Sequence, residues 1–99
     1  MIEVKNGNGC QDLARETRSL LWGEGFTVVA IGNHIDFGME RTVIIYRPDA
    51  TRVAQTLARQ YFPSATLQPG GRLTANVDVR IILGQNLSPE KDVFAKLVY

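Results

Sequence analysis

The segment IEVKNGNG at residues 2–9 predicts a strand that turns sharply into a helix. Apolar and charged residues alternate from Ile2 to Lys5, which indicates a strand with one buried face. The Asn-Gly-Asn-Gly sequence after it tolerates positive φ angles and breaks the strand in a tight turn. The residues that follow carry an apolar stripe at helical spacing, which is typical of a helix lying on a sheet. The members of this stripe are Cys10, Leu13, Ala14, Thr17, Leu20 and Leu21.

Two further strands and a second helix are predicted in the middle of the chain. The β-branched and aromatic runs at 26–31 and 42–46 predict strands, and the polar segment 32–40 between them predicts a loop. We expect Asp49 to cap a helix that ends at Pro63. The buried stripe of this helix is predicted to contain Ala50, Val53, Ala54, Leu57 and Tyr61.

The last part of the chain completes the predicted fold. A short strand is expected at 65–68 and a longer one at 77–83. The resulting order is strand, helix, strand, strand, helix, strand, strand, which contains two βαβ-like units. We therefore predict an α/β fold of the α+β sandwich type, with a single mixed sheet of four to five strands and two helices on one face. The domain is expected to span residues 1–86, and residues 87–99 to form a tail that packs on it.

The composition fits one globular domain without a dedicated nucleic-acid surface. The chain has 99 residues, of which 44% are hydrophobic and 21% charged, and its formal net charge is +1. A nucleic-acid binder usually has a clear basic excess, so no nucleic-acid partner is expected. A single cysteine, Cys10, allows no internal disulfide. With no signal peptide and no apolar run that would span a bilayer, the chain is expected to be either cytoplasmic or a piece of a longer, anchored protein.

Four short motifs stand in a fixed order along the chain. They are VKNGNG at 4–9, GFTV at 25–28, TVIIYRP at 42–48 and DVRIILG at 78–84. Together they resemble the LytR C-terminal domain family, the C-terminal module of LytR–CpsA–Psr cell-envelope proteins. The first three are similar to the V-x-N-G-x-G, G-F-x-V and T-x-I-x-Y-R-P elements of that family. The resemblance runs from residue 2 to about residue 85.

This resemblance implies a non-catalytic, extracytoplasmic interaction or accessory domain of a longer protein tethered to the membrane upstream. In many family members a separate domain transfers glycopolymers to the cell wall, and that chemistry belongs to the other domain. The implied partners are an anionic cell-wall polymer or an envelope protein. The chain departs from the family at Asp12, where Gly is common, and at Asn86, where Asp is common.

The candidate binding residues lie in the first turn and on the outer faces of the two predicted helices. The turn at 6–9 opens a helix whose N–H groups and dipole favour an anion, but it equally fits a turn that requires glycine. Trp22 is expected beside Arg15 and Arg18, where it can stack on a sugar ring or anchor a protein partner, or else fold over the sheet edge. Arginines on both helices would present either a basic surface to an acidic polymer or an ordinary solvated face. The complete set is Asn6, Gly7, Asn8, Gly9, Arg15, Arg18, Trp22, Arg52 and Arg59.

The sheet face away from the helices suggests an alternative function. Alternate residues of a strand point to opposite faces, so the apolar strand residues cannot all face the helices. These residues are Val29, Ile31, Ile44, Tyr46 and Ile82. We expect the remainder to be covered by Phe94, Leu97 and Tyr99 of the tail, or by a second copy of the chain or another domain. The alternative is therefore a structural or oligomerisation module whose contact includes Tyr46 and Ile82.

A small enzyme is the third and weakest hypothesis. His34 lies beside Asp36 in a predicted loop, but no serine or metal motif accompanies the pair. Cys10 falls on the apolar stripe, which favours a small packed residue over a nucleophile. We expect no catalysis, no cofactor and no metal.

Overall fold

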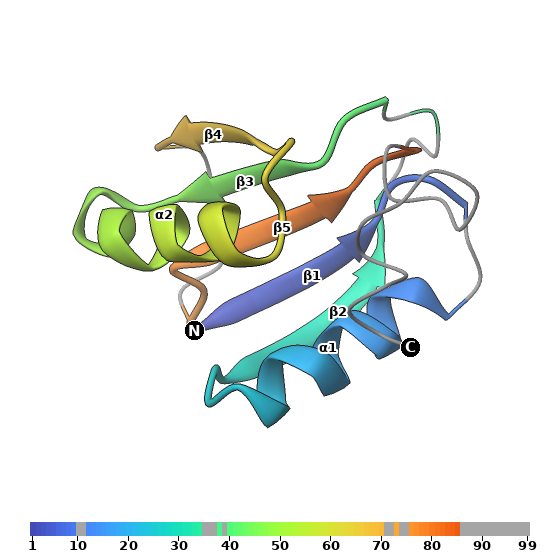
Figure 1. The fold of residues 1–99 in the computed structure, drawn as a ribbon, viewed down its shortest axis with the longest axis horizontal. Coiled ribbons are helices and arrows are strands. Elements are labelled where there is room, and N and C mark those ends of the chain that lie inside the picture. Colours follow the sequence, from blue (N-terminus) through green and yellow to red (C-terminus); the bar gives the residue numbers. More distant parts are fainter. Residues whose placement is uncertain (10–11, 35–37, 39, 71–72, 74–75, 86–99) are drawn as a thin grey trace.

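The computed structural model describes residues 1–9, 12–34, 38, 40–70, 73 and 76–85. These residues form one sheet and two helices (Figure 1). In chain order the elements are β1 (Ile2–Asn6), α1 (Leu13–Gly23), β2 (Val28–Asn33), β3 (Val43–Tyr46), the 3₁₀ turn η1 (Pro48–Ala50), α2 (Thr51–Gln60), β4 (Thr66–Pro69) and β5 (Val79–Leu83). The predicted order of strands and helices is confirmed.

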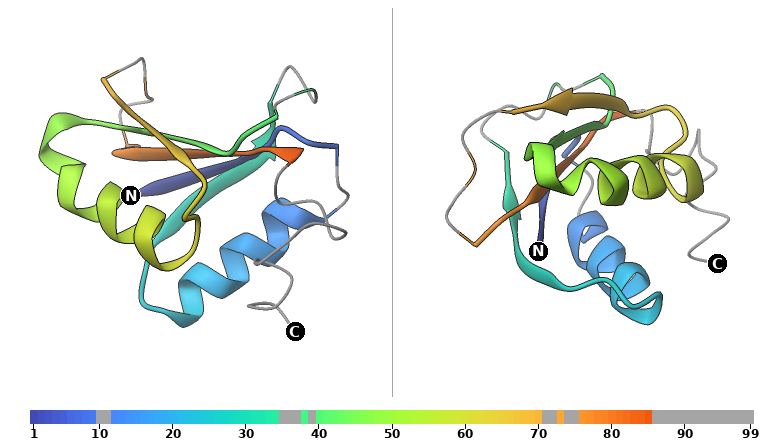
Figure 2. Two further views of the ribbon diagram at one scale, coloured as in Figure 1. Left: turned by 45° about the horizontal axis from the view of Figure 1, so that its top comes forward. Right: turned by 90° about the vertical axis from the view of Figure 1, so that its left-hand side faces the viewer.

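The sheet is mixed and has five strands in the order β2-β1-β5-β3-β4. β1 runs parallel to both of its neighbours, β2 and β5. β3 is antiparallel to β5 and parallel to β4. The two helices are the crossovers of β1-α1-β2 and β3-α2-β4, and both lie on the same face of the sheet (Figure 2). The predicted fold class, a mixed sheet with two helices on one face, is confirmed.

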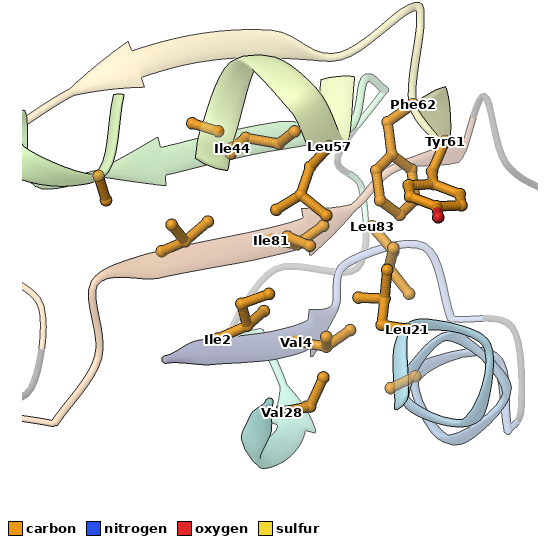
Figure 3. Packing of buried hydrophobic residues seen from close by; sticks show 14 of the residues in the cluster. Ile2, Val4, Leu21, Val28, Ile44, Leu57, Tyr61, Phe62, Ile81 and Leu83 are labelled. Carbon is orange, nitrogen blue, oxygen red and sulfur yellow. The ribbon is translucent and has the colours of Figure 1, made fainter. Parts of the chain in front are cut away.

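The core lies between this face and the helices. Val4, Leu21, Leu57, Ile81 and Leu83 are fully buried, and Figure 3 shows them pointing toward one another from β1, α1, α2 and β5. This arrangement follows from the alternation of β1 and β5, which sends every second side chain to the helices. It places the apolar stripe of each helix on the sheet, as the sequence predicts.

The stripe of α1 is confirmed in its described part. Leu13, Ala14, Thr17 and Leu21 are buried, and Leu20 packs against the core in a half-buried position. Cys10 lies outside the described residues.

The predicted stripe of α2 is correct except at one position. Ala50, Ala54, Leu57 and Tyr61 are buried, whereas Val53 is 40% exposed. Val53 is about 100° around the helix from Ala54 and therefore lies at the margin of the side that meets the sheet.

The predicted cap of the second helix is wrong. Asp49 lies inside the 3₁₀ turn η1, and no side chain caps α2. Pro48 has a fixed φ angle and no N–H, which suits the first position of such a turn. The Thr51 hydroxyl donates to the Pro48 carbonyl at 2.7 Å, so the turn is held from its C-terminal side.

The second strand begins two residues later than predicted, because Phe26 belongs to the end of α1. The Phe26 N–H donates to the Leu21 carbonyl at 2.9 Å and the Gly25 N–H to the Trp22 carbonyl at 3.1 Å. With Gly25 at φ 90°, these bonds form a Schellman motif. The Phe26 ring then packs edge-on against Tyr61, with ring centroids 6.1 Å apart.

The open face of the sheet differs from the expected apolar surface. Ile31, Ile44 and Tyr46 belong to or pack against the core on the helix side. Ile82 is paired with Val43 and, by alternation with the buried Ile81, points to the other face. Tyr46 and Ile82 therefore lie on opposite faces, and a single face-to-face contact cannot include both.

The centre of this open face carries an ion pair. Glu3 and Arg80 are direct partners in the β1–β5 register, and the Arg80 Nε atom donates to the Glu3 Oε1 atom at 2.5 Å. Their side chains are only 12% and 21% exposed. A charged pair thus interrupts the apolar residues that the sequence places on this face.

Candidate functional site

The predicted anion-binding turn is held by bonds to its own chain. The Asn6 Oδ1 atom accepts the backbone N–H groups of Asn8 and Gly9, both at 3.1 Å. The Asn8 Nδ2 atom donates to the Gly84 carbonyl at 2.8 Å. The Gly7 N–H donates to the carbonyl of Leu83, the last residue of β5, at 2.9 Å. Asn6 and Gly7 are buried. These contacts give the turn a structural role in joining the ends of β1 and β5.

Trp22 both folds over the sheet edge and stays exposed beside an arginine, the two placements that the sequence left open. Its Nε1 atom donates to the Val28 carbonyl at 3.2 Å, which places the indole against the edge strand β2. The side chain nevertheless stays 53% exposed. The guanidinium carbon of Arg18 lies 4.9 Å from the centre of the indole ring, within cation–π range. The helix therefore presents an exposed aromatic ring and a guanidinium side by side.

Arg15 extends this pair toward the start of α1. It lies one turn before Arg18 and is exposed, with its Nη1 atom 3.7 Å from the Asp12 Oδ1 atom. Arg18 forms no ion pair with any described residue, and its Nε atom is buried without a hydrogen-bond partner among them. We call Arg15, Arg18 and Trp22 the α1 surface.

Arg52 and Arg59 are exposed on α2 but do not extend the α1 surface. α1 packs on β1 and β2, whereas α2 packs on β3 and β4. The two helices lie over opposite halves of the sheet (Figure 2), so the arginines of α1 are separated from those of α2. The structure therefore does not bring the four arginines together, which favours the alternative of an ordinary solvated face.

The helix ends meet instead through a polar contact. The Tyr61 hydroxyl, just after α2, donates to the Glu24 Oε1 atom after α1 at 2.9 Å. Burial and this hydrogen bond raise the pKa of the Tyr61 hydroxyl. The phenol therefore stays protonated and keeps the helices connected over the ordinary pH range.

Of the three residues considered for catalysis, His34, Asp36 and Cys10, the structure describes only His34. His34 is half-buried, and its backbone N–H donates to the Asn6 carbonyl at 2.8 Å. Asp36 and Cys10 lie outside the described residues, so the His34–Asp36 hypothesis stays a prediction. Within the described ranges, no group of three His, Cys, Asp or Glu side chains is placed to hold a metal ion. No helix in that part of the chain is long and apolar enough to cross a membrane.

Two hollows lie beside the helices. The smaller, of about 120 Å³, is near the start of α1 and is lined by Asn6, Asp12, Ala14, Arg15, Ile31, Gly32 and Asn33. The larger, of about 610 Å³, lies between α2 and β4 and includes Arg59. Neither hollow was predicted from the sequence, and the one sequence signal for the larger hollow is the small side chains of Ala58 and Ala65.

Comparison with known families agrees with the motifs. A family model described as LytR cell envelope-related transcriptional attenuator, LytR_C, matches residues 1–86. The chain belongs to the LytR_C family. The resemblance inferred from the four motifs is thereby confirmed, and with it the assignment to a cell-envelope-related family. No curated protein sequence matches the chain.

Two solved structures share the fold of this LytR_C domain. One is the crystal structure of the soluble domain of a conserved hypothetical secreted protein, the Rv2700 ortholog, from Mycobacterium marinum, with a TM-score of 0.73 and 21% identity over 88% of this chain. The LytR_C domain spans 60% of that chain. The other is the solution structure of the C-terminal domain of RV0431, with a TM-score of 0.57 and 22% identity, covering 84% of this chain and 70% of that one.

Asp12, where the LytR_C resemblance leads one to expect glycine, has a left-handed backbone with φ 64°. We expect Asp12→Val to lower the free energy of unfolding by about 1–2 kcal/mol, because a branched Cβ crowds the following carbonyl in this conformation. Asp12→Gly is expected to stay within about 0.5 kcal/mol of the parent, since relief of strain is offset by a more flexible unfolded chain. Urea unfolding of both variants measures the difference, and equal stabilities would contradict the assigned backbone conformation.

Proposed function

We propose that this LytR_C domain is a non-catalytic, extracytoplasmic interaction domain of a longer, anchored cell-envelope protein. It binds an anionic wall glycopolymer through the α1 surface. The cell-envelope description of the family supports the setting. A similar fold in the soluble domain of a protein described as secreted supports the extracytoplasmic location.

The observation that carries the proposal is the exposed Trp22 indole with the Arg18 guanidinium beside it. The flat face of an indole offers a large, rigid, partly apolar contact area on which a sugar ring can lie. A guanidinium presents a planar fork of N–H donors that matches a phosphate or carboxylate group. Because Arg18 forms no ion pair with the described residues, its charge is available to a ligand. A polymer that alternates sugars or polyols with phosphates would engage both groups.

Poly(glycerol phosphate) titrated into the ¹⁵N-labelled chain tests this proposal, with dextran as an uncharged polymer. We expect the charged polymer to shift the Trp22 indole N–H signal, and we expect added salt to weaken binding because the contact is exposed. Trp22→Ala and Arg18→Gln are each expected to weaken binding about tenfold, which corresponds to about 1.4 kcal/mol. Arg52→Gln on α2 is the matched control, since it removes one exposed arginine outside the α1 surface.

Two results would count against the proposal. The first is that both α1 variants bind the polymer within about twofold of the parent affinity, which is a free-energy change of only about 0.4 kcal/mol. The other is an equal loss with Arg52→Gln, which would indicate non-specific attraction to net charge. Thermal unfolding of Trp22→Ala separates loss of the contact from loss of the fold, since the indole also bonds to β2.

A further inference from the structure

The hollow between α2 and β4 is a shallow, open groove whose lining is partly apolar and partly polar. Its volume is about 610 Å³, and its lining consists of Gln55, Ala58, Arg59, Pro63, Ala65 and Leu67. Ala58, Ala65 and Leu67 are half-buried and pack against the core, whereas the other three are exposed. The groove exists because two alanines stand where longer side chains would fill the space between helix and strand.

The strand side of the groove has backbone groups that the sheet does not use. The Thr66 and Gly70 N–H groups donate to the Thr42 and Tyr46 carbonyls of the β3 side, at 2.9 and 2.8 Å. In a parallel ladder alternate residues face opposite neighbours, so the N–H and C=O of Leu67 face away from β3. β4 is the last strand of the sheet. An extended segment can therefore add to this edge at Leu67.

The helix side of the groove is positively charged. α2 has the sequence TRVAQTLARQ, with two arginines and no acidic residue, and β4 has the uncharged sequence TLQP. No ion pair with Arg59 occurs in the part of the chain that the structure describes. A carboxylate at the rim of the groove would thus meet an uncommitted guanidinium, a pairing that is stronger than a neutral hydrogen bond.

We propose that the α2–β4 groove binds an extended acidic peptide segment of a protein partner. One apolar side chain of the segment lies on Ala58, Ala65 and Leu67, a neighbouring carboxylate pairs with Arg59, and the peptide backbone bonds to Leu67. The groove lies over the half of the sheet opposite the α1 surface. The domain would then hold a polymer and a protein at two separate places.

A second copy of the chain is a poorer occupant than an acidic peptide. Two β4 edges that pair about a twofold axis would bring two copies of α2 to the same interface. The helices would face each other with arginines and no acidic partner, and like charges across an interface oppose association. Pro69 lacks an N–H and limits pairing along the edge, which suits a short contact at Leu67 more than a long strand pair.

Selection from a phage-displayed library of random linear heptapeptides on the full chain tests the proposal, with counter-selection on an Arg59→Glu variant. We expect enriched sequences to share an acidic residue within two positions of an aliphatic one. A synthetic peptide of the consensus sequence is expected to shift the Leu67 amide signal of the ¹⁵N-labelled chain. Arg59→Glu and Ala58→Leu are each expected to weaken this peptide at least about tenfold, about 1.4 kcal/mol. Arg52→Glu, on the same helix but outside the groove, is expected to stay within about twofold.

The proposal is overturned if counter-selection removes no enriched sequence, or if the consensus peptide shifts α1 signals in place of the groove. It is equally overturned if groove signals of the unliganded chain move with protein concentration, because a second copy would then be the occupant. Arg59 is exposed, so its replacement leaves the fold intact and the test remains valid even if Ala58→Leu unfolds the domain.

Discussion

Gly84→Ala is expected to lower the free energy of unfolding by about 3 kcal/mol, at the upper end for an overpacked site. A Cβ atom added at Gly84 would lie 2.2 Å from the carbonyl carbon of Arg41 and 2.5 Å from both its oxygen and the Thr42 nitrogen. All three are backbone atoms, so no side chain can rotate out of the way. The end of β5 would have to move away from the start of β3.

This movement would also break polar contacts. The Gly84 N–H donates to the Thr42 hydroxyl at 3.1 Å, and its carbonyl accepts the Asn8 side chain at 2.8 Å. The first bond is buried and the second is partly buried. Leaving a buried donor or acceptor without a partner costs about 1–3 kcal/mol.

Urea denaturation measures the effect, and Gly23→Ala is the matched control. A Cβ at Gly23 would meet nothing within 4 Å, and alanine is the better helix former, so this variant is expected to gain about 0.5 kcal/mol. The same chemical change thus has opposite signs at two glycines. A Gly84→Ala protein as stable as the parent would show that the strand ends are not packed as closely as described.

Local sequence patterns predicted the elements well but not how their ends meet. The alternation in β1 and the stripe of α1 each required only nearby residues, and both are confirmed. By contrast, the Asn8–Gly84 bond joins residues 76 positions apart. The family motifs at both places look like two independent turns in the sequence, whereas the structure makes them one junction.

The errors occurred where two local preferences compete. Phe26 has strand propensity, but its N–H completes the end of α1. Asp49 is a good helix cap by residue type, but Pro48 starts a 3₁₀ turn before the helix. Neither outcome can be read from propensity alone, because one hydrogen bond contributes about 1 kcal/mol, which is as much as the spread of the propensities themselves.

The candidate site was harder to predict than the fold. Trp22 and Arg18 are four residues apart in one helix, so their proximity follows from helical spacing and was foreseen. The separation of Arg15 and Arg18 from Arg52 and Arg59 depends on strand order, which places β5 and β1 between the two helical units. The α2–β4 groove depends on missing side-chain volume, which no charged or aromatic motif marks.

Removing one member of the Glu3–Arg80 pair on the open sheet face is expected to destabilise the domain more than removing both. Glu3→Leu leaves Arg80 without an acidic partner among the described residues, and Arg80→Met leaves Glu3 with only the more distant Lys5, whose Nζ atom is 3.9 Å away. Each single change is expected to cost about 2–3 kcal/mol, somewhat below the cost for a fully buried pair. The double variant replaces both charges with apolar side chains of similar volume and is expected to lie within about 1 kcal/mol of the parent. The coupling free energy between the two positions is therefore expected to be at least about 2 kcal/mol.

Urea unfolding of the parent, the two single variants and the double variant measures this coupling, and Arg15→Met provides the control. Arg15 and Asp12 are 66% and 52% exposed and 3.7 Å apart, so breaking their pair is expected to cost less than about 0.5 kcal/mol. Additive effects of the Glu3 and Arg80 changes would show that the 2.5 Å contact between them contributes nothing specific. A large coupling would instead mean that a shielded charge pair occupies the centre of the open face, where an apolar dimer contact would otherwise have to form.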